Sequence, residues 1–131
     1  MPQRSPVMDA DRHGAERRQR AQGAKADKLQ AALVALDPQL GRWADEHVFG
    51  EVWADDALGF EERMLVAIAA LAAQNRRNQL RNYLHGALQA GLPAAKLREV
   101  LRMMTVYAGF PVAIEAMSEL DAVLKAHEGH R

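Results

Sequence analysis

Apolar residues recur every three or four positions along most of the chain from Leu29 onward, and this spacing predicts amphipathic helices. The clearest series cover residues 29–36, 40–48, 61–75, 78–90, 96–108 and 111–126. The series at 61–75 is apolar nearly all round, which predicts a central core helix. We find no convincing alternation of strand type and no internal repeat. The pattern therefore predicts an all-α fold.

Residues with special backbone preferences mark the ends of these predicted helices. Asp37 is suited to the N-cap of a helix, and Pro38 is suited to its first position. Gly50 is expected to end or bend the helix that precedes it, and residues 55–59 read as a loop. Gly91 is expected to cap the C-terminus of its helix. The helix boundaries are therefore predicted from local chemistry as well as from periodicity.

The polar beginning of the chain predicts where the folded domain starts. Residues 1–22 carry few large apolar side chains, so burial cannot offset the entropy of ordering them, and we expect a loosely ordered segment. The first aromatic residue is Trp43, and the packed core is expected to begin near Leu29. We predict a single domain over residues 23–126, followed by a tail at 127–131.

Composition excludes several classes of chemistry. The chain has 131 residues, 49% of them hydrophobic, which is enough for one domain with a buried core. It has no cysteine, which excludes disulfides and thiol chemistry, including that of a thiol peroxidase. Signal-peptide and membrane-span patterns are missing, so we expect a cytoplasmic protein with no membrane partner. His127 and His130 belong to a polar tail, and no motif predicts a metal site.

Charge is balanced overall but unevenly distributed. The formal net charge is zero, which disfavours a nucleic-acid partner. Residues 41–62 hold seven acids and one base, whereas residues 63–102 hold seven bases and one acid. We interpret both as solvated faces, including Arg76, Arg77 and Arg81. The alternatives are electrostatic pairing between subunits or across a pocket and, for these three arginines, a surface for nucleic acid.

Several stretches occur in an informative order. They are Phe-Gly-Glu-Val-Trp at 49–53, the segment 58–65, Gly-Ala-Leu-Gln-Ala-Gly at 86–91 and Val-Tyr-Ala-Gly-Phe-Pro at 106–111. Together they resemble the carboxymuconolactone decarboxylase family, which shares its helical fold with the alkyl hydroperoxidase D proteins. The resemblance implies a single-domain helical protein that works without a cofactor. It also implies a homo-oligomer, a trimer or a hexamer, that binds a small-molecule substrate near subunit interfaces.

The chain departs from the family pattern at reactive positions. Arg76, Gln79 and Tyr83 occupy the positions of the Cys-x-x-Cys-x-x-x-His motif of the hydroperoxidase branch. The decarboxylase branch usually keeps that histidine; here His85 lies two residues further on, turned by about 200° around the helix. Residues 55–56 are both aspartate where that branch has an Arg-Pro pair. This sign reversal argues against a dicarboxylic acid substrate.

The retained polar residues still suit the chemistry that the resemblance implies. Decarboxylation without a cofactor needs a general acid and dipoles that stabilise an enolate. Glu51, Tyr83 and His47 are the catalytic candidates; His47 and Glu51 are four residues apart and would share a helix face. The candidates for substrate binding are Arg63, Trp53, His85 and Tyr107. Each of these residues also has a plainer structural interpretation in packing, capping or ion pairing.

Three functional hypotheses follow. The first is a cofactor-independent enzyme that acts on a small carbonyl or lactone carboxylic acid through an enolate-type intermediate. The second is a non-catalytic or divergent member of the fold that binds a small molecule. The third is an isomerase or cyclase that uses the same enolate stabilisation.

Overall fold

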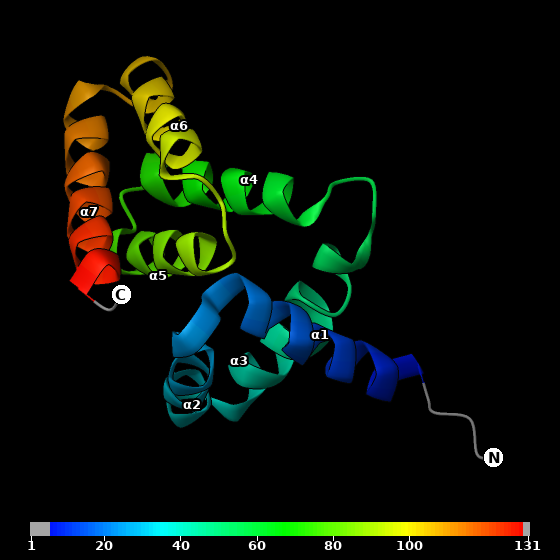
Figure 1. The fold of residues 1–131 in the computed structure, drawn as a ribbon. Coiled ribbons are helices and arrows are strands. Elements are labelled where there is room, and N and C mark those ends of the chain that lie inside the picture. The colour runs from blue at the N-terminus through cyan, green and yellow to red at the C-terminus, as the bar shows by residue number, and fades with distance from the viewer. Residues whose placement is uncertain (1–5, 130–131) are drawn as a thin grey trace. The chain divides into compact units, whose positions relative to one another are not determined.

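Every regular element of residues 6–129, the part of the chain that this computed structural model describes, is a helix (Figure 1). The all-α prediction is therefore confirmed. The ends of the predicted N-terminal segment and tail, residues 1–5 and 130–131, lie outside the described residues. The elements are α1 (Pro6–Gln22), a 3₁₀ turn η1 (Gly23–Lys25), α2 (Ala26–Leu36), α3 (Pro38–Trp43), a π-helical turn η2 (Ala44–Val48), a 3₁₀ turn η3 (Val52–Ala54), α4 (Phe60–Ala73), α5 (Arg77–Gln89), α6 (Ala94–Tyr107) and α7 (Phe110–Gly129).

The chain forms two compact units, which divide between residues 59 and 60. The first unit contains α1 to η3, and the second contains α4 to α7. The predicted domain boundaries at 23 and 126 stay a prediction.

Local capping is as the sequence predicts. The Asp37 Oδ1 atom accepts a hydrogen bond from the Gln39 backbone N–H at 3.0 Å, and Pro38 occupies the start of α3. After α5, Gly91 has φ +94°, a left-handed conformation that favours glycine and closes a helix C-terminus. Residues 55–59 form a loop, in which the Asp55 side chain accepts a hydrogen bond from the Ala57 N–H at 2.8 Å.

Helix α1 differs from the loosely ordered segment that we expected at residues 1–22. It packs against η2 through positions that carry no large apolar side chain: Gly14, Arg18 and Ala21 are all buried. A Cβ atom at Gly14 would overlap the Asp45 carbonyl oxygen and lie 2.9 Å from the Gly50 nitrogen. Helix α1 is therefore packed through the close approach of two backbones. The expectation of a loose segment considered only burial of large apolar side chains.

The helix predicted over residues 40–48 changes its winding partway. After α3 ends at Trp43, the Phe49 N–H donates to the Ala44 carbonyl oxygen at 2.9 Å, a bond that spans five residues where an α-helix spans four. Phe49 and Gly50 are buried immediately after this wide turn. The turn therefore determines the direction in which the side chains of residues 49–51 point relative to α3.

Helices α4 to α7 form the core of the second unit. Each contributes a buried stripe, as the 3.6-residue period predicts. The largest fully buried side chains of this unit are Met64, Ile68, Leu80, Leu84, Leu97, Leu101 and Leu120. Contacts join α4 to α5, α6 and α7, and join α7 to α5 and α6. Along α4, Val66 remains exposed, so the prediction of a helix covered all round is met only along one stripe.

A buried carboxylate joins α5 to α7. Glu119 is 4% exposed, and its two oxygens accept hydrogen bonds from the Nε atoms of Arg77 at 2.9 Å and Arg81 at 2.8 Å. The hydrogen bond from Arg81 holds the pKa of Glu119 below its ordinary value, against the opposing effect of burial. Arg77 and Arg81 stay exposed, as expected for a solvated face, and each is in addition tied to Glu119 by an ion pair.

Candidate functional site

An open, largely apolar groove of about 710 Å³ lies within the first unit. It is formed by residues of α2, α3 and η2 together with Glu51, just after η2. The lining residues are Leu33, Leu40, Trp43, Ala44, Glu46, His47, Val48 and Glu51. Its volume is in the range that small-molecule sites occupy, and its few polar groups are gathered on one short segment. This groove is the candidate site that the structure supports best.

Two of the predicted catalytic residues meet in this groove. His47 Nδ1 lies 3.6 Å from Glu51 Oε2, close enough for an ion pair but too long for a hydrogen bond. The Glu51 N–H donates to the His47 carbonyl oxygen at 3.1 Å, so the chain keeps α-helical spacing between them despite Gly50. Their side chains are 63% and 68% exposed. An acid–base step here therefore requires something else, a substrate or a neighbouring subunit, to exclude water.

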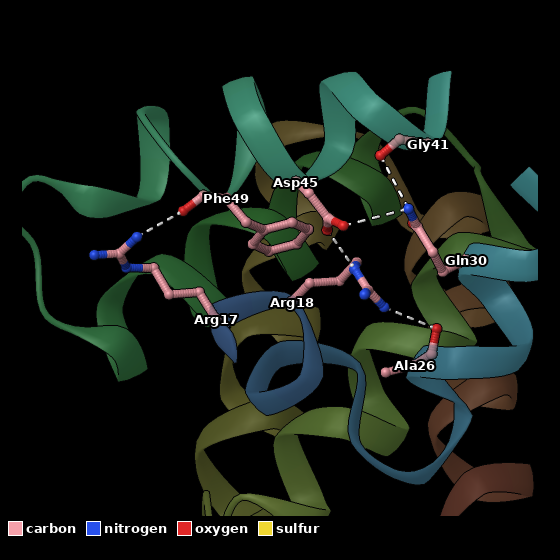
Figure 2. Close-up of polar contacts among 7 residues, drawn as sticks. All are labelled: Arg17, Arg18, Ala26, Gln30, Gly41, Asp45 and Phe49. Atoms are coloured by element: carbon pink, nitrogen blue, oxygen red, sulfur yellow. Dashed lines mark hydrogen bonds and ion pairs between the residues drawn. The ribbon is translucent and has the colours of Figure 1, made fainter. Parts of the chain in front are cut away.

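A largely buried polar network holds the turn that carries His47 (Figure 2). Arg18 Nε donates to Asp45 Oδ1 at 2.7 Å, and Arg18 Nη1 donates to the Ala26 carbonyl oxygen at 3.0 Å. Gln30 Nε2 donates to the Gly41 carbonyl oxygen at 2.9 Å and lies 3.5 Å from Asp45 Oδ2. Figure 2 shows Asp45 between Arg18 and Gln30, so the carboxylate joins α1 to α2.

The two tryptophans of the first unit have different surroundings. Trp53, predicted as a pocket wall, packs its ring against Phe49 with centroids 5.0 Å apart and planes tilted by 52°. Trp43 lines the groove and is half exposed. Trp43 and His47 are four residues apart, a spacing that places two residues on one face of a helix. The role of Trp53 in substrate binding stays a prediction.

The other predicted site residues belong to the second unit. Arg63 lies on α4; Tyr83 and His85 lie on α5, and all three side chains are partly buried. Tyr107 ends α6 and is 76% exposed. These four residues belong to a different compact unit from His47 and Glu51, and their roles stay predictions.

Other hollows of the second unit have different linings. One, of about 400 Å³, is lined mainly by Leu88, residues 91–94, Leu124 and His127. Another, of about 460 Å³, includes Arg98, Ile114 and Asp121. Among the described residues, no group of three or more His, Asp or Glu side chains is placed to hold a metal ion. No helix in the same range is long and apolar enough to cross a membrane.

Comparison with known proteins decides the family. Residues 38–122, about two-thirds of the chain, match the sequence profile of the carboxymuconolactone decarboxylase family. The chain belongs to this family. All seven predicted site residues fall inside the matched range, as do α3 and η2. Helices α1 and α2, which supply Arg18, Gln30 and the Leu33 wall of the groove, precede it.

Two curated relatives support this assignment. The chain is 35% identical over 77 residues to the 4-carboxymuconolactone decarboxylase of Acinetobacter baylyi, covering 59% of this chain and 58% of the relative. It is 31% identical over 72 residues to the nitrosuccinic acid decarboxylase npaB of Metarhizium robertsii, covering 55% of this chain and 50% of the relative. The chain thus spans 58% and 50% of the lengths of these two relatives.

Sequence reasoning missed the residues that support the site. Glu46 in the groove carried no signal beyond its acidic surroundings. Arg18 and Asp45 are 27 residues apart, and Arg18 lies in a polar segment, so neither periodicity nor spacing indicated their pairing. Arg18 shares a helix face with Gly14 and Ala21. This pattern indicates a packed face only when it is known that η2 lies against it.

Proposed function

We propose that this protein is a cofactor-independent decarboxylase that acts on a small carboxylic acid bound in the groove of the first unit. The observation that carries the proposal is the His47–Glu51 pair, 3.6 Å apart, on a largely apolar groove. Membership of the family and the names of both relatives support a reaction that releases carbon dioxide. The predicted isomerase or cyclase would use the same groups without loss of carbon dioxide.

The proposed reaction needs one electron acceptor and one proton donor. The bond between the carboxylate and its neighbouring carbon breaks, and its electron pair moves into an adjacent electron-accepting group as carbon dioxide leaves. Protonated His47 then returns a proton to that carbon, and the Glu51 carboxylate stabilises the imidazolium before the transfer.

The groove and the relatives bound the substrate class. A lactone in one relative's substrate name and a nitro group in the other's are both groups able to accept an electron pair. Glu46 and Glu51 give the groove wall negative charge, and Asp55 and Asp56 follow shortly after. Like charges repel, so we propose a carbonyl, lactone or nitro acid with a single carboxylate as the substrate.

A non-catalytic small-molecule binding protein is the second candidate. It is favoured by the apolar lining of the groove, by the exposure of its acid–base pair and by Tyr83, which stands where the decarboxylase branch usually has histidine. Such a protein would bind the same apolar compounds without converting them. The two candidates therefore differ in their dependence on Glu51.

We predict that Glu51→Gln lowers kcat for carbon dioxide release by about 10²- to 10⁴-fold, the usual contribution of general acid–base catalysis. Glutamine keeps the shape of the side chain but cannot stabilise the imidazolium as a charge. The measurement is a coupled bicarbonate assay across a panel of β-keto, lactone and β-nitro acids. His47→Gln and Tyr83→Phe, assayed in parallel, test the other two catalytic candidates.

The matched control is Glu16→Gln, which removes an exposed carboxylate from α1, where Glu16 forms an ion pair with Arg12 at 3.7 Å. It should retain wild-type turnover. Equal turnover of Glu51→Gln and wild-type protein would reject the acid–base role. Binding of panel compounds without any conversion by the wild type would favour the non-catalytic candidate.

We also propose that the protein works as a homo-oligomer, as the family resemblance implies. Five large apolar side chains are exposed near the junction of α6 and α7, at helical spacing on each helix. They are Met103, Val106, Tyr107, Phe110 and Ile114. A gathering of this kind is typical of a protein interface.

Val106→Lys combined with Phe110→Lys is therefore predicted to lower the sedimenting mass to that of a monomer. A desolvated lysine at the centre of an interface costs more than the contact it replaces. Analytical ultracentrifugation measures the mass, and Ala122→Lys, on an exposed position of α7 outside this group, is the control. An unchanged oligomer in the double variant would place the interface elsewhere.

A further inference from the structure

We infer that Arg18, acting through Asp45, is a positioning residue for the His47–Glu51 pair. The inference rests on the proposed function of that pair, but its geometry concerns a helix that precedes the matched family segment, residues 38–122. Arg18 lines no part of the groove and would not touch the substrate. Its effect would come from fixing the turn on which His47 is carried.

Arg18 is built into the first unit as a buried structural group. The residue is 5% exposed, and the side chain of Asp45 is 15% exposed. The guanidinium donates to Asp45 Oδ1 at 2.7 Å and, through a second nitrogen, to the Ala26 carbonyl oxygen at 3.0 Å. Charge-assisted bonds in a desolvated position are strong and directional. The guanidinium thus fixes Asp45, the second residue of the π-helical turn, relative to α2.

Helix α1 holds both ends of that turn. At the far end, Arg17 Nη1 donates to the Phe49 carbonyl oxygen at 3.1 Å. Between these two anchors, the backbone of α1 approaches the turn so closely at Gly14 that no Cβ atom would fit beside Asp45. Both arginines and the glycine act on the same short segment, and His47 lies within it.

The winding of the turn determines which residues face one another. A π-helical turn accommodates one residue more than an α-helical turn, and each residue rotates an α-helix by about 100°. If Ala44–Val48 rewound as an α-helix, the residues after the turn would rotate by roughly this amount relative to α3. Glu51 would then leave the groove face that includes Leu40 and Trp43. Anchoring Asp45 and Phe49 opposes this rewinding.

The test combines a structural readout that needs no substrate with an activity readout. In the wild type, Glu51→Gln is expected to shift the NMR signals of the His47 ring protons, because the two side chains are in contact. In Arg18→Met, residues 45–51 lose the anchor on Asp45 and are expected to sample several windings, so the same Glu51→Gln change should shift those signals less. In assays, Arg18→Met is expected to lower kcat about 10- to 100-fold, as loss of an outer-shell contact does elsewhere, with a smaller change in KM.

Two further variants keep the test decisive. Arg18→Lys keeps a positive charge beside Asp45, but lysine cannot donate in two directions from a planar group as arginine does. This variant replaces Arg18→Met if tryptophan fluorescence shows that Arg18→Met is unfolded. Arg12→Met is the control on the same helix, where Arg12 makes an exposed ion pair with Glu16. It should behave as the wild type in both readouts.

An equal response of His47 to Glu51→Gln in wild-type and folded Arg18 variants would overturn the inference, whatever the activity. Absence of turnover in the wild type would instead count against the proposed function, and the NMR comparison would still decide whether Arg18 positions the pair. An unequal NMR response with unchanged kcat would also overturn the inference, because the positioning would then serve no catalytic purpose.

Discussion

Replacing Arg77 and Arg81 together by methionine is expected to lower the free energy of unfolding of the second unit by about 3–5 kcal/mol. The cause is Glu119, whose side chain is 5% exposed and whose two oxygens each accept a bond from one arginine. Without them, a carboxylate stays buried with no cation to compensate for its lost hydration. The arginines themselves are nearly half exposed, so most of the effect comes from the carboxylate left behind.

The measurement is urea unfolding followed by the NMR signals of Tyr83 and Tyr107, the two tyrosines of the chain, which both lie in the second unit. Adding Glu119→Leu to the double variant is expected to recover most of the loss, because an apolar side chain of similar volume often replaces a buried ion pair without cost. If the triple variant were as unstable as the double variant, lost packing of the arginine stems would be the cause.

The direction of the Glu119 pKa shift predicts the pH dependence of the same effect. The wild-type pKa is lowered, chiefly by the hydrogen bond from Arg81, so this group stabilises the fold above its unfolded pKa of about 4.3. That contribution is lost as the pH falls below this value and passes through the folded pKa. In the double variant, burial without arginines raises the pKa, so Glu119 is protonated more readily. The stability difference between wild type and double variant should therefore shrink as the pH falls.

The helices of the second unit were predictable because each buries a regular apolar stripe. Leu80, Leu84 and Ala87 on α5, for example, follow the 3.6-residue period and are all buried. Gly91 could be assigned as a cap because few other residues adopt its backbone conformation. The pairing of Glu119 with Arg77 and Arg81 could not be predicted, because it depends on how α5 packs against α7. Glu119 lies 42 residues after Arg77 and 38 residues after Arg81 in the chain.

The candidate site was predictable only in part, for a related reason. The four-residue spacing predicted that His47 and Glu51 share a helix face, and the structure keeps that spacing across Gly50. The groove wall at Leu33 comes from a helix that precedes the stretches that carry the resemblance, which begin at Phe49, so no motif indicated it. Helix α1 gave no apolar signal because it packs by backbone proximity and by the buried Arg18.

Gly14→Ala is the variant that tests this mode of packing, and it is expected to lower the stability of the first unit by about 1–3 kcal/mol or more. In an isolated helix the same change would be favourable by about 1 kcal/mol, because alanine is the better helix former. Here the added Cβ would overlap the Asp45 carbonyl oxygen and lie 2.9 Å from the Gly50 nitrogen. Both are backbone atoms, which cannot move aside as a flexible side chain would, so α1 must shift.

Urea unfolding followed by tryptophan fluorescence measures this effect, because Trp43 and Trp53, the two tryptophans of the chain, both lie in the first unit. Gly129→Ala on α7 is the matched control: a Cβ atom there meets nothing within 4 Å, so stability should be unchanged or slightly raised. A stabilised Gly14→Ala protein would show that α1 does not lie against the turn. A destabilised one should also lose the response of His47 to Glu51→Gln, because a shift of α1 carries Arg17 and Arg18 away from the turn they anchor.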